Sequence, residues 1–221
     1  VFSEGGMMPH LKDGSIFIDH TTTSFKLAKH LNESFKSKGI NFIDAPVSGG
    51  INGAIEGALT FMTGGTQESF SIAKPLFEVM GNKTVHCGKI GSGQVAKICN
   101  NMILGTTMIA LSESFTMAKK LGIDQKTFFE ISSKATGMSW AMLNHLPVAN
   151  IIETAAANNN FKPGFAAKMM VKDLSLAQSA ASSVNLNTPL GRLVLDMYKD
   201  FIEEGHGELD YTAIIKKFDK N

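Results

Sequence analysis

Arginine is almost absent from this sequence, and its scarcity limits the partners that the protein can have. Only Arg192 is an arginine among the 21 basic residues of the 221-residue chain, and the formal net charge is +1. Phosphate-reading surfaces use arginine forks, and nucleic acids and anionic membranes attract strongly basic surfaces. The composition therefore predicts neither a nucleic-acid partner nor a membrane partner.

Cysteine is nearly as scarce. Cys87 and Cys99 are the only two, and their spacing fits neither a C-x-x-C redox pair nor a zinc pattern. No cluster of histidines or carboxylates suggests a metal site either. We therefore expect no bound metal, and two reduced thiols in the core of an intracellular protein.

Long hydrophobic runs and targeting segments are also missing. The longest apolar run, residues 102–111, is interrupted by threonines and falls short of the roughly 20 residues that cross a bilayer. No secretory or transit segment is visible. The chain begins at Val1 and not at methionine, which indicates a fragment whose true start, with any targeting signal, lies upstream.

The most distinctive stretch is a glycine-rich turn that runs into a long helical pattern. After Gly91, Ser92 and Gly93 almost no helix breaker occurs before Gly122. Ser92 can cap the helix start, and Gly122 suits the position just past its end. The helix would have about 29 residues and a length of roughly 43 Å, which is typical of a helix that spans between two parts of a protein.

Lys97 and Asn101 lie on one face of this helix, one turn apart. Gly93 precedes them by one turn and Gly105 follows by one turn, so we interpret the glycines as positions where another molecule approaches the helix closely. Such a pair is usually solvent-facing. Here the surrounding residues predict a buried helix, in which an ammonium group is costly and needs a functional reason. These residues are Val95, Ile98, Met102, Ile103, Ile109 and Leu111.

The two halves of the chain have different patterns. In the first half, four short apolar segments predict strands and the amphipathic segments between them predict helices, which indicates βαβ units and a mainly parallel, open α/β sheet. The strands are expected at residues 15–19, 40–44, 58–63 and 83–87, and the helices at residues 27–35 and 68–80. No strand pattern follows residue 91, so the second half is predicted to be all-α. Its helices are expected at residues 124–134, 165–184, 189–204 and after 209, with a looser stretch at 140–152.

Two strand ends carry candidate binding groups. Ser48, Gly49 and Gly50 follow a strand, and a serine with backbone N–H groups at two glycines can form an anion nest. The segment lacks the Lys-[Ser/Thr] of a P-loop, so it does not predict a triphosphate site. An ordinary turn remains the alternative. At the earlier strand end, Thr22 belongs to a polar segment, residues 19–22, that either caps the next helix or faces a cofactor.

Four motifs together resemble the β-hydroxyacid dehydrogenase family. Residues 44–65 resemble its substrate-binding motif, and residues 91–101 resemble its catalytic motif, a glycine turn followed by lysine and asparagine one turn apart. Residues 172–177 are similar to its C-terminal cofactor-contacting motif, and residues 18–22 to the strand end where the family contacts a dinucleotide. All four occur in the family's order over nearly the whole chain.

The resemblance implies a dehydrogenase that oxidises a short 3-hydroxy acid and passes a hydride to NAD, with NADP as the alternative. It implies Lys97 as general acid/base and Asn101 as the residue that hydrogen-bonds substrate and holds the lysine. The substrate carboxylate would lie on Ser48, Gly49 and Gly50. The branch that acts on 3-hydroxyisobutyrate in valine catabolism is the most similar, with methylmalonate semialdehyde as product.

The resemblance also implies which residues contact the cofactor and which residues shape the substrate pocket. Thr22 and Lys172 would contact the cofactor, whereas a Lys-Asp pair on a helix is otherwise usually solvated. Trp140 and Phe165 would shape the pocket around the substrate's small side group, although a lone tryptophan is most often a core residue. We also expect a homo-oligomer, and a cytoplasmic location, or the mitochondrial matrix in a eukaryote.

The implied fold is the remainder of a Rossmann-type parallel sheet, residues 1–90, joined by one long helix to an all-α C-terminal domain, residues 91–221. The chain departs from the family because it lacks the G-x-G-x-x-G unit that holds a pyrophosphate. Two alternatives therefore stay open. One is a related reductase of tartronate semialdehyde, glyoxylate or succinic semialdehyde, and the other is a non-catalytic binding module.

Overall fold

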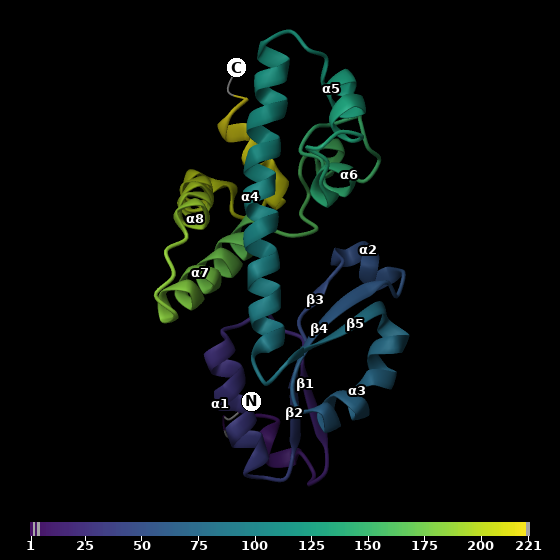
Figure 1. Cartoon of the computed structure of the whole chain (residues 1–221), viewed down its shortest axis with the longest axis vertical. Coiled ribbons are helices and arrows are strands. Elements are labelled where there is room, and N and C mark those ends of the chain that lie inside the picture. Colours follow the sequence, from purple (N-terminus) through teal and green to yellow (C-terminus); the bar gives the residue numbers. More distant parts are fainter. Residues whose placement is uncertain (2, 4, 220–221) are drawn as a thin grey trace. The chain divides into compact units, whose positions relative to one another are not determined.

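The computed structural model describes residues 1, 3 and 5–219, which form two compact units, Val1–Cys99 and Asn100–Asn221 (Figure 1). The chain passes from the first unit to the second within α4 (Ser92–Lys120). The functional division predicted at residues 90 and 91 stays a prediction. The predicted α/β class, with a helical second half, is confirmed.

Unit 1 contains two βαβ units, as the alternating patterns predicted. β1 pairs in parallel with β2, and β4 pairs in parallel with β5. Each predicted strand and helix of this unit is confirmed to within two residues. The elements in chain order are η1 (Met8–His10), β1 (Ile16–Asp19), α1 (Phe25–Lys36), β2 (Asn41–Asp44), β3 (Val47–Ser48), α2 (Gly50–Ile55), β4 (Leu59–Gly64), α3 (Gln67–Met80) and β5 (Gly81–Gly88).

The sheet is not parallel throughout. The short strand β3 runs antiparallel to β4, with Ser48 opposite Thr60, and β2 meets β4 in a single antiparallel pair, Asp44 with Gly64. The sequence did not predict β3 or α2, because a two-residue strand has too few residues to show a period of two. Because β3 pairs with β4, Ser48 lies at the end of a strand that is anchored in the sheet.

Helices cover both faces of the sheet, α1 on one side and α3 on the other (Figure 1). The alternation of side chains along each strand explains this arrangement. On one face the ring of Phe17 stacks on Phe35 of α1, with centroids 4.5 Å apart. On the opposite face Ile18 and Ile43 pack in the cluster that contains Phe77 of α3.

Unit 2 is helical, as predicted. α7 and α8 lie side by side, and their apolar faces pack with those of α4 around a core that includes Met108, Phe115 and Tyr198 (Figure 1). The helices after α4 are α5 (Gln125–Ser132), α6 (Trp140–Asn144), η2 (Ala156–Asn159), α7 (Ala167–Ser183), α8 (Pro189–Phe201), η3 (Ile202–His206) and η4 (Tyr211–Lys217).

The prediction for the start of α4 is wrong, and the prediction for its end is confirmed. At the start, the carboxylate of Asp44 accepts hydrogen bonds from the backbone N–H groups of Gly91 (2.7 Å) and Gln94 (3.0 Å). The cap therefore comes from the end of β2 and not from Ser92, which is the first helical residue. At the far end, Gly122 has a φ of 87° and follows the helix as predicted.

The expected burial of α4 holds for only part of its surface. Ile98, Ile109 and Leu111 are buried, but Val95 is 40% exposed and Ile103 is 67% exposed. Cys99 is also exposed, so the prediction of two core thiols is wrong, although both cysteines are free. By length and composition alone α4 is apolar enough to cross a membrane, a test that core helices of globular proteins also pass.

Candidate functional site

The predicted catalytic pair lies on α4 with the expected spacing but with unequal burial. Lys97 is half-buried, whereas Asn101 is only 1% exposed. The expectation of a deeply buried lysine is therefore wrong, because α4 is apolar on only part of its circumference. The half-buried position leaves the lysine side chain within reach of a small molecule from solvent.

Asn101 is held by the carboxylate of Asp173, which the sequence marked only as part of a Lys-Asp pair and did not connect to Asn101. Its side-chain nitrogen donates a short hydrogen bond to Oδ2 of Asp173 on α7, and Asp173 is also 1% exposed. Oδ1 of Asp173 lies 3.0 Å from Nζ of Lys172 but accepts no hydrogen bond from the described residues. The contact with Lys172 is therefore mainly electrostatic, and Asp173 fixes the orientation of the Asn101 amide.

The Lys172–Asp173 pair is thus divided between solvent and interior. The side chain of Lys172 is 46% exposed, while that of Asp173 is 1% exposed, so the pair is not simply solvated. A signal for this was present in the sequence. Asp173 occupies a core position among buried residues of α7, namely Met170, Leu174 and Ala177.

Gly93 and Gly105 serve packing, so their interpretation as points of ligand approach is wrong. A Cβ at Gly93 would collide with the carbonyl oxygen of Met62 and lie 2.9 Å from Oδ2 of Asp44. A Cβ at Gly105 would meet Sδ of Met170 at 3.3 Å and neighbouring apolar side chains. The two glycines allow the chain's own sheet and helices to approach α4.

Ser48, Gly49 and Gly50 form an open turn at the start of α2. Ser48 is half-buried, the two glycines are exposed, and their φ angles are 135° and 63°. No side chain caps the start of α2. The first N–H groups of that helix and the Ser48 hydroxyl are therefore suited to binding a small anion such as a carboxylate.

Thr22 lies in the loop between β1 and α1. Ser24 caps α1 by accepting a hydrogen bond from the N–H of Leu27, so the helix-cap alternative for residues 19–22 is wrong. Asp19 instead shapes the loop, because its Oδ1 accepts from both the N–H and the hydroxyl of Thr21. Thr22 is half-buried at the carboxyl end of a parallel strand, where open α/β sheets bind dinucleotides. Its hydroxyl and the loop amides suit the uncharged hydroxyl and carboxamide groups of such a cofactor.

Trp140 and Phe165 belong to one aromatic group in unit 2, connected through His145 and Tyr211, which no sequence motif marks. Trp140 packs on His145 with ring centroids 4.8 Å apart, and Phe165 packs on Tyr211 at 5.8 Å. His145 Nδ1 and the Tyr211 hydroxyl share a hydrogen bond of 2.8 Å. Trp140 is 55% exposed, so it is not the core residue that lone tryptophans usually are.

Burial keeps this aromatic group uncharged near neutral pH. It lowers the pKa of His145, against the opposing charge of Asp210, and it raises the pKa of Tyr211 well above its ordinary value. The group therefore presents an apolar surface with few polar atoms. In the sequence, the one feature that pointed to this aromatic group was the recurrence of aromatic residues near Trp140 and Phe165.

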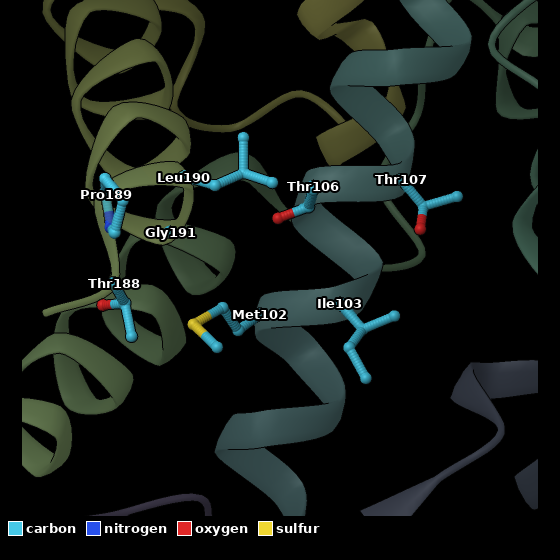
Figure 2. A pocket seen from close by; sticks show the side chains of 8 residues that line it. All are labelled: Met102, Ile103, Thr106, Thr107, Thr188, Pro189, Leu190 and Gly191. Carbon is cyan, nitrogen blue, oxygen red and sulfur yellow. The ribbon is translucent and has the colours of Figure 1, made fainter. Parts of the chain in front are cut away.

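A separate cavity of about 390 Å³ lies between α4 and the start of α8 (Figure 2). Met102 and Thr106 point toward the segment that begins α8, and none of the predicted site residues lines the cavity. Its lining is Met102, Ile103, Thr106, Thr107, Thr188, Pro189, Leu190 and Gly191. Across residues 1, 3 and 5–219, no group of three histidine, cysteine or acidic side chains could hold a metal ion.

Two family models together match almost the whole chain. One, described as the NAD binding domain of 6-phosphogluconate dehydrogenase, matches residues 1–88. The other, described as NAD-binding of NADP-dependent 3-hydroxyisobutyrate dehydrogenase, matches residues 91–218.

Individual relatives agree with these matches. The chain is 41% identical over 204 residues to a "Probable 3-hydroxyisobutyrate dehydrogenase" of Mycobacterium tuberculosis, covering 92% of this chain and 69% of that protein. It is 37% identical over 216 residues to an NAD-dependent L-serine dehydrogenase of Pseudomonas aeruginosa, covering 98% and 72%. A solved structure of Mycobacterium tuberculosis 3-hydroxyisobutyrate dehydrogenase with L-serine is similar, with a TM-score of 0.90, 39% identity and coverage of 96% and 73%.

Proposed function

Because the chain belongs to the β-hydroxyacid dehydrogenase family and is an NAD(P)-dependent dehydrogenase, we propose 3-hydroxyisobutyrate as its hydroxy acid and methylmalonate semialdehyde as the product. The observation that supports the catalytic part best is the half-buried Lys97, one turn from an Asn101 that Asp173 orients. The bound nicotinamide supplies the acceptor for the hydride. This chain's residues bind the acid, orient it and move its hydroxyl proton.

Lys97 is the general acid/base in this proposal. In the oxidation the Lys97 amine takes the proton of the substrate hydroxyl as the hydride leaves the same carbon, and in the reverse direction the ammonium returns that proton to the carbonyl oxygen. Asn101 hydrogen-bonds the same oxygen. Its amide is fixed by the bond to Asp173, so no rotation of the side chain is needed when substrate binds.

Ser48, Gly49 and Gly50 bind the substrate carboxylate. The open turn at the start of α2, with its positive φ angles and uncapped N–H groups, supports this role. The aromatic group of Trp140, His145, Tyr211 and Phe165 supports a pocket for an apolar substituent, such as the methyl group of 3-hydroxyisobutyrate.

Thr22 and Lys172 contact the nicotinamide cofactor in this proposal, NAD or NADP. Thr22 contributes a hydroxyl group from the end of β1. Lys172 contributes a cation whose charge is partly balanced by Asp173, at 3.0 Å. The residues that would hold a pyrophosphate through a G-x-G-x-x-G turn do not occur in this sequence.

We also propose that residues 1–90 act as the cofactor-binding part and residues 91–221 as the substrate and assembly part of a homo-oligomer. Exposed apolar side chains support an assembly role for the second part, since large side chains this exposed are costly to hydrate. They include Ile103, Met117, Leu121, Leu190 and Leu193. The cytoplasmic location remains a prediction.

L-Serine is a second candidate substrate. It is also a 3-hydroxy acid, and two similar proteins carry it in their names, an L-serine dehydrogenase and a solved complex with L-serine. The ammonium group of L-serine replaces the methyl group of 3-hydroxyisobutyrate. This ammonium group would therefore need a hydrogen-bond acceptor, or the face of the Trp140 ring, next to it in the site.

Initial rates with a panel of acids test the proposal. The panel contains 3-hydroxyisobutyrate, L-serine, glycerate and 4-hydroxybutyrate, each with NAD and with NADP, and the reduced cofactor is followed by its absorbance. We expect the highest kcat/KM for 3-hydroxyisobutyrate. A higher value for L-serine makes the chain a serine dehydrogenase, and no reduction with any acid favours the non-catalytic alternative.

A further inference from the structure

The loop that contains Thr22 is held by the side chain of Gln94 on α4. Gln94 is fully buried, with 0% of its surface exposed. Its Oε1 accepts a hydrogen bond from the N–H of Thr23 at 2.9 Å, and its Nε2 donates to the carbonyl oxygen of Thr21 at 2.8 Å. The two bonds engage the backbone on both sides of Thr22.

We propose that Gln94 is a positioning residue that sets the direction of the Thr22 hydroxyl for the cofactor. This inference rests on the proposed function, since it takes Thr22 as a cofactor contact. Both peptide groups that border Thr22 are fixed by one amide, so the backbone angles of Thr22 have little freedom. A loop that is already ordered loses less entropy when a ligand binds, and the ligand then binds more tightly.

The amide of a glutamine side chain matches the loop in both hydrogen bonds. The loop offers one donor, the N–H of Thr23, and one acceptor, the carbonyl of Thr21. A glutamine side chain supplies the complementary acceptor and donor, whereas a carboxylate supplies two acceptors and an aliphatic chain supplies neither. A buried position that faces both a donor and an acceptor therefore accounts for the residue type.

Gln94 also connects the loop to the catalytic helix. Its own backbone N–H donates to Oδ2 of Asp44, the carboxylate that caps α4, and it lies three residues before Lys97. The opposite side of the loop is held by Asp19, which accepts from the N–H of Thr21. The loop, the strand end and the start of α4 thus form one hydrogen-bonded unit, in which the Gln94 side chain connects the helix to the loop.

Gln94→Ala tests the proposal, because it removes both side-chain bonds and keeps the backbone bond to Asp44. Amide hydrogen exchange in the cofactor-free chain is one measurement. Exchange should become faster at Thr23, whose N–H loses its acceptor, while Thr21 is an internal control because Asp19 still holds its N–H. The second measurement is the cofactor dissociation constant, which we expect to rise about tenfold, with the KM of the hydroxy acid nearly unchanged.

Gln94→Glu provides a readout that a purely structural role would not give. The introduced carboxyl can replace both bonds when it is protonated, but it faces the Thr21 carbonyl as a second acceptor when it is ionised. Asp19 and Asp44 favour its protonated form, and Lys97 on the same helix favours the ionised form. Cofactor binding by this variant should be close to wild type at about pH 5 and several-fold weaker at about pH 8, whereas wild-type binding lacks this transition.

The matched control is Gln178→Ala, which removes another buried glutamine whose side chain bonds Thr188 in unit 2. It should lower stability without changing cofactor affinity. If the wild-type chain binds the cofactor and Gln94→Ala binds it equally well, this inference is overturned but the proposed function is not. Weaker cofactor binding by Gln94→Ala without faster exchange at Thr23 has the same consequence. A wild-type chain that binds neither NAD nor NADP overturns the proposed function as well.

Discussion

The amide of Asn101 on α4 donates a hydrogen bond to the carboxylate of Asp173 on α7, and both side chains are almost completely buried. This bond connects two segments of the chain that lie 72 residues apart in sequence. It places a negative charge behind the amide and leaves the other end of the amide, its oxygen, as an acceptor for Asn100. The orientation of Asn101 is therefore set before any substrate arrives.

Replacing Asp173 with alanine should lower both stability and turnover. The Asn101 amide would lose its acceptor in a dry site, which costs about 1–3 kcal/mol of the free energy of unfolding. Turnover should fall because Asn101 can then rotate. Denaturant unfolding and steady-state kinetics measure the two effects. The control is Glu208→Ala, since Glu208 pairs with Lys168 but its side chain is 81% exposed, and little change is expected.

The contacts of Gly93 predict a large stability cost for Gly93→Ala. A methyl group there would overlap the Met62 carbonyl and crowd the Asp44 carboxylate, so the free energy of unfolding should fall by about 1–3 kcal/mol or more. Gly137→Ala is the matched control, because nothing lies within 4 Å of its added Cβ. A Gly93→Ala protein of wild-type stability that no longer binds substrate would restore the ligand-approach interpretation.

His145 should make the stability of unit 2 depend on pH. Burial lowers its pKa from the ordinary 6.5, so the folded chain resists a proton that the unfolded chain accepts. Above pH 6.5 the imidazole is neutral in both states, and as the pH falls through the folded-state pKa the free energy of unfolding should decrease. Denaturant titrations of wild type and His145→Phe at about pH 7.5 and about pH 5 measure this contribution. An equal loss of stability in both proteins at low pH would contradict the role of His145.

Local sequence patterns were enough to predict most of the fold. The alternation of strand and helix, the long helix and its end at Gly122 all follow from period, breakers and turn residues, which act over a few neighbouring positions. The start of α4 could not be predicted in the same way. Its cap comes from Asp44, 47 residues before Gly91, and no local rule connects these positions.

The candidate site was predictable only where a motif marks it. Lys97, Asn101, Ser48 and Thr22 were found by spacing and resemblance, and their roles remain proposals. Gln94 was missed because its partners are backbone atoms of a distant loop. The burial of Lys97 was overestimated, since the apolar residues around α4 include Ile103, which is 67% exposed.

Lys97→Ala is the most direct test of the central claim, that Lys97 moves the hydroxyl proton in a hydride-transfer reaction. With 3-hydroxyisobutyrate and saturating cofactor we expect kcat to fall by about 10²–10⁴, with unchanged cofactor affinity. Lys120→Ala, at the exposed far end of the same helix, should keep wild-type turnover. A Lys97→Ala protein that retains most of its activity would contradict the assignment.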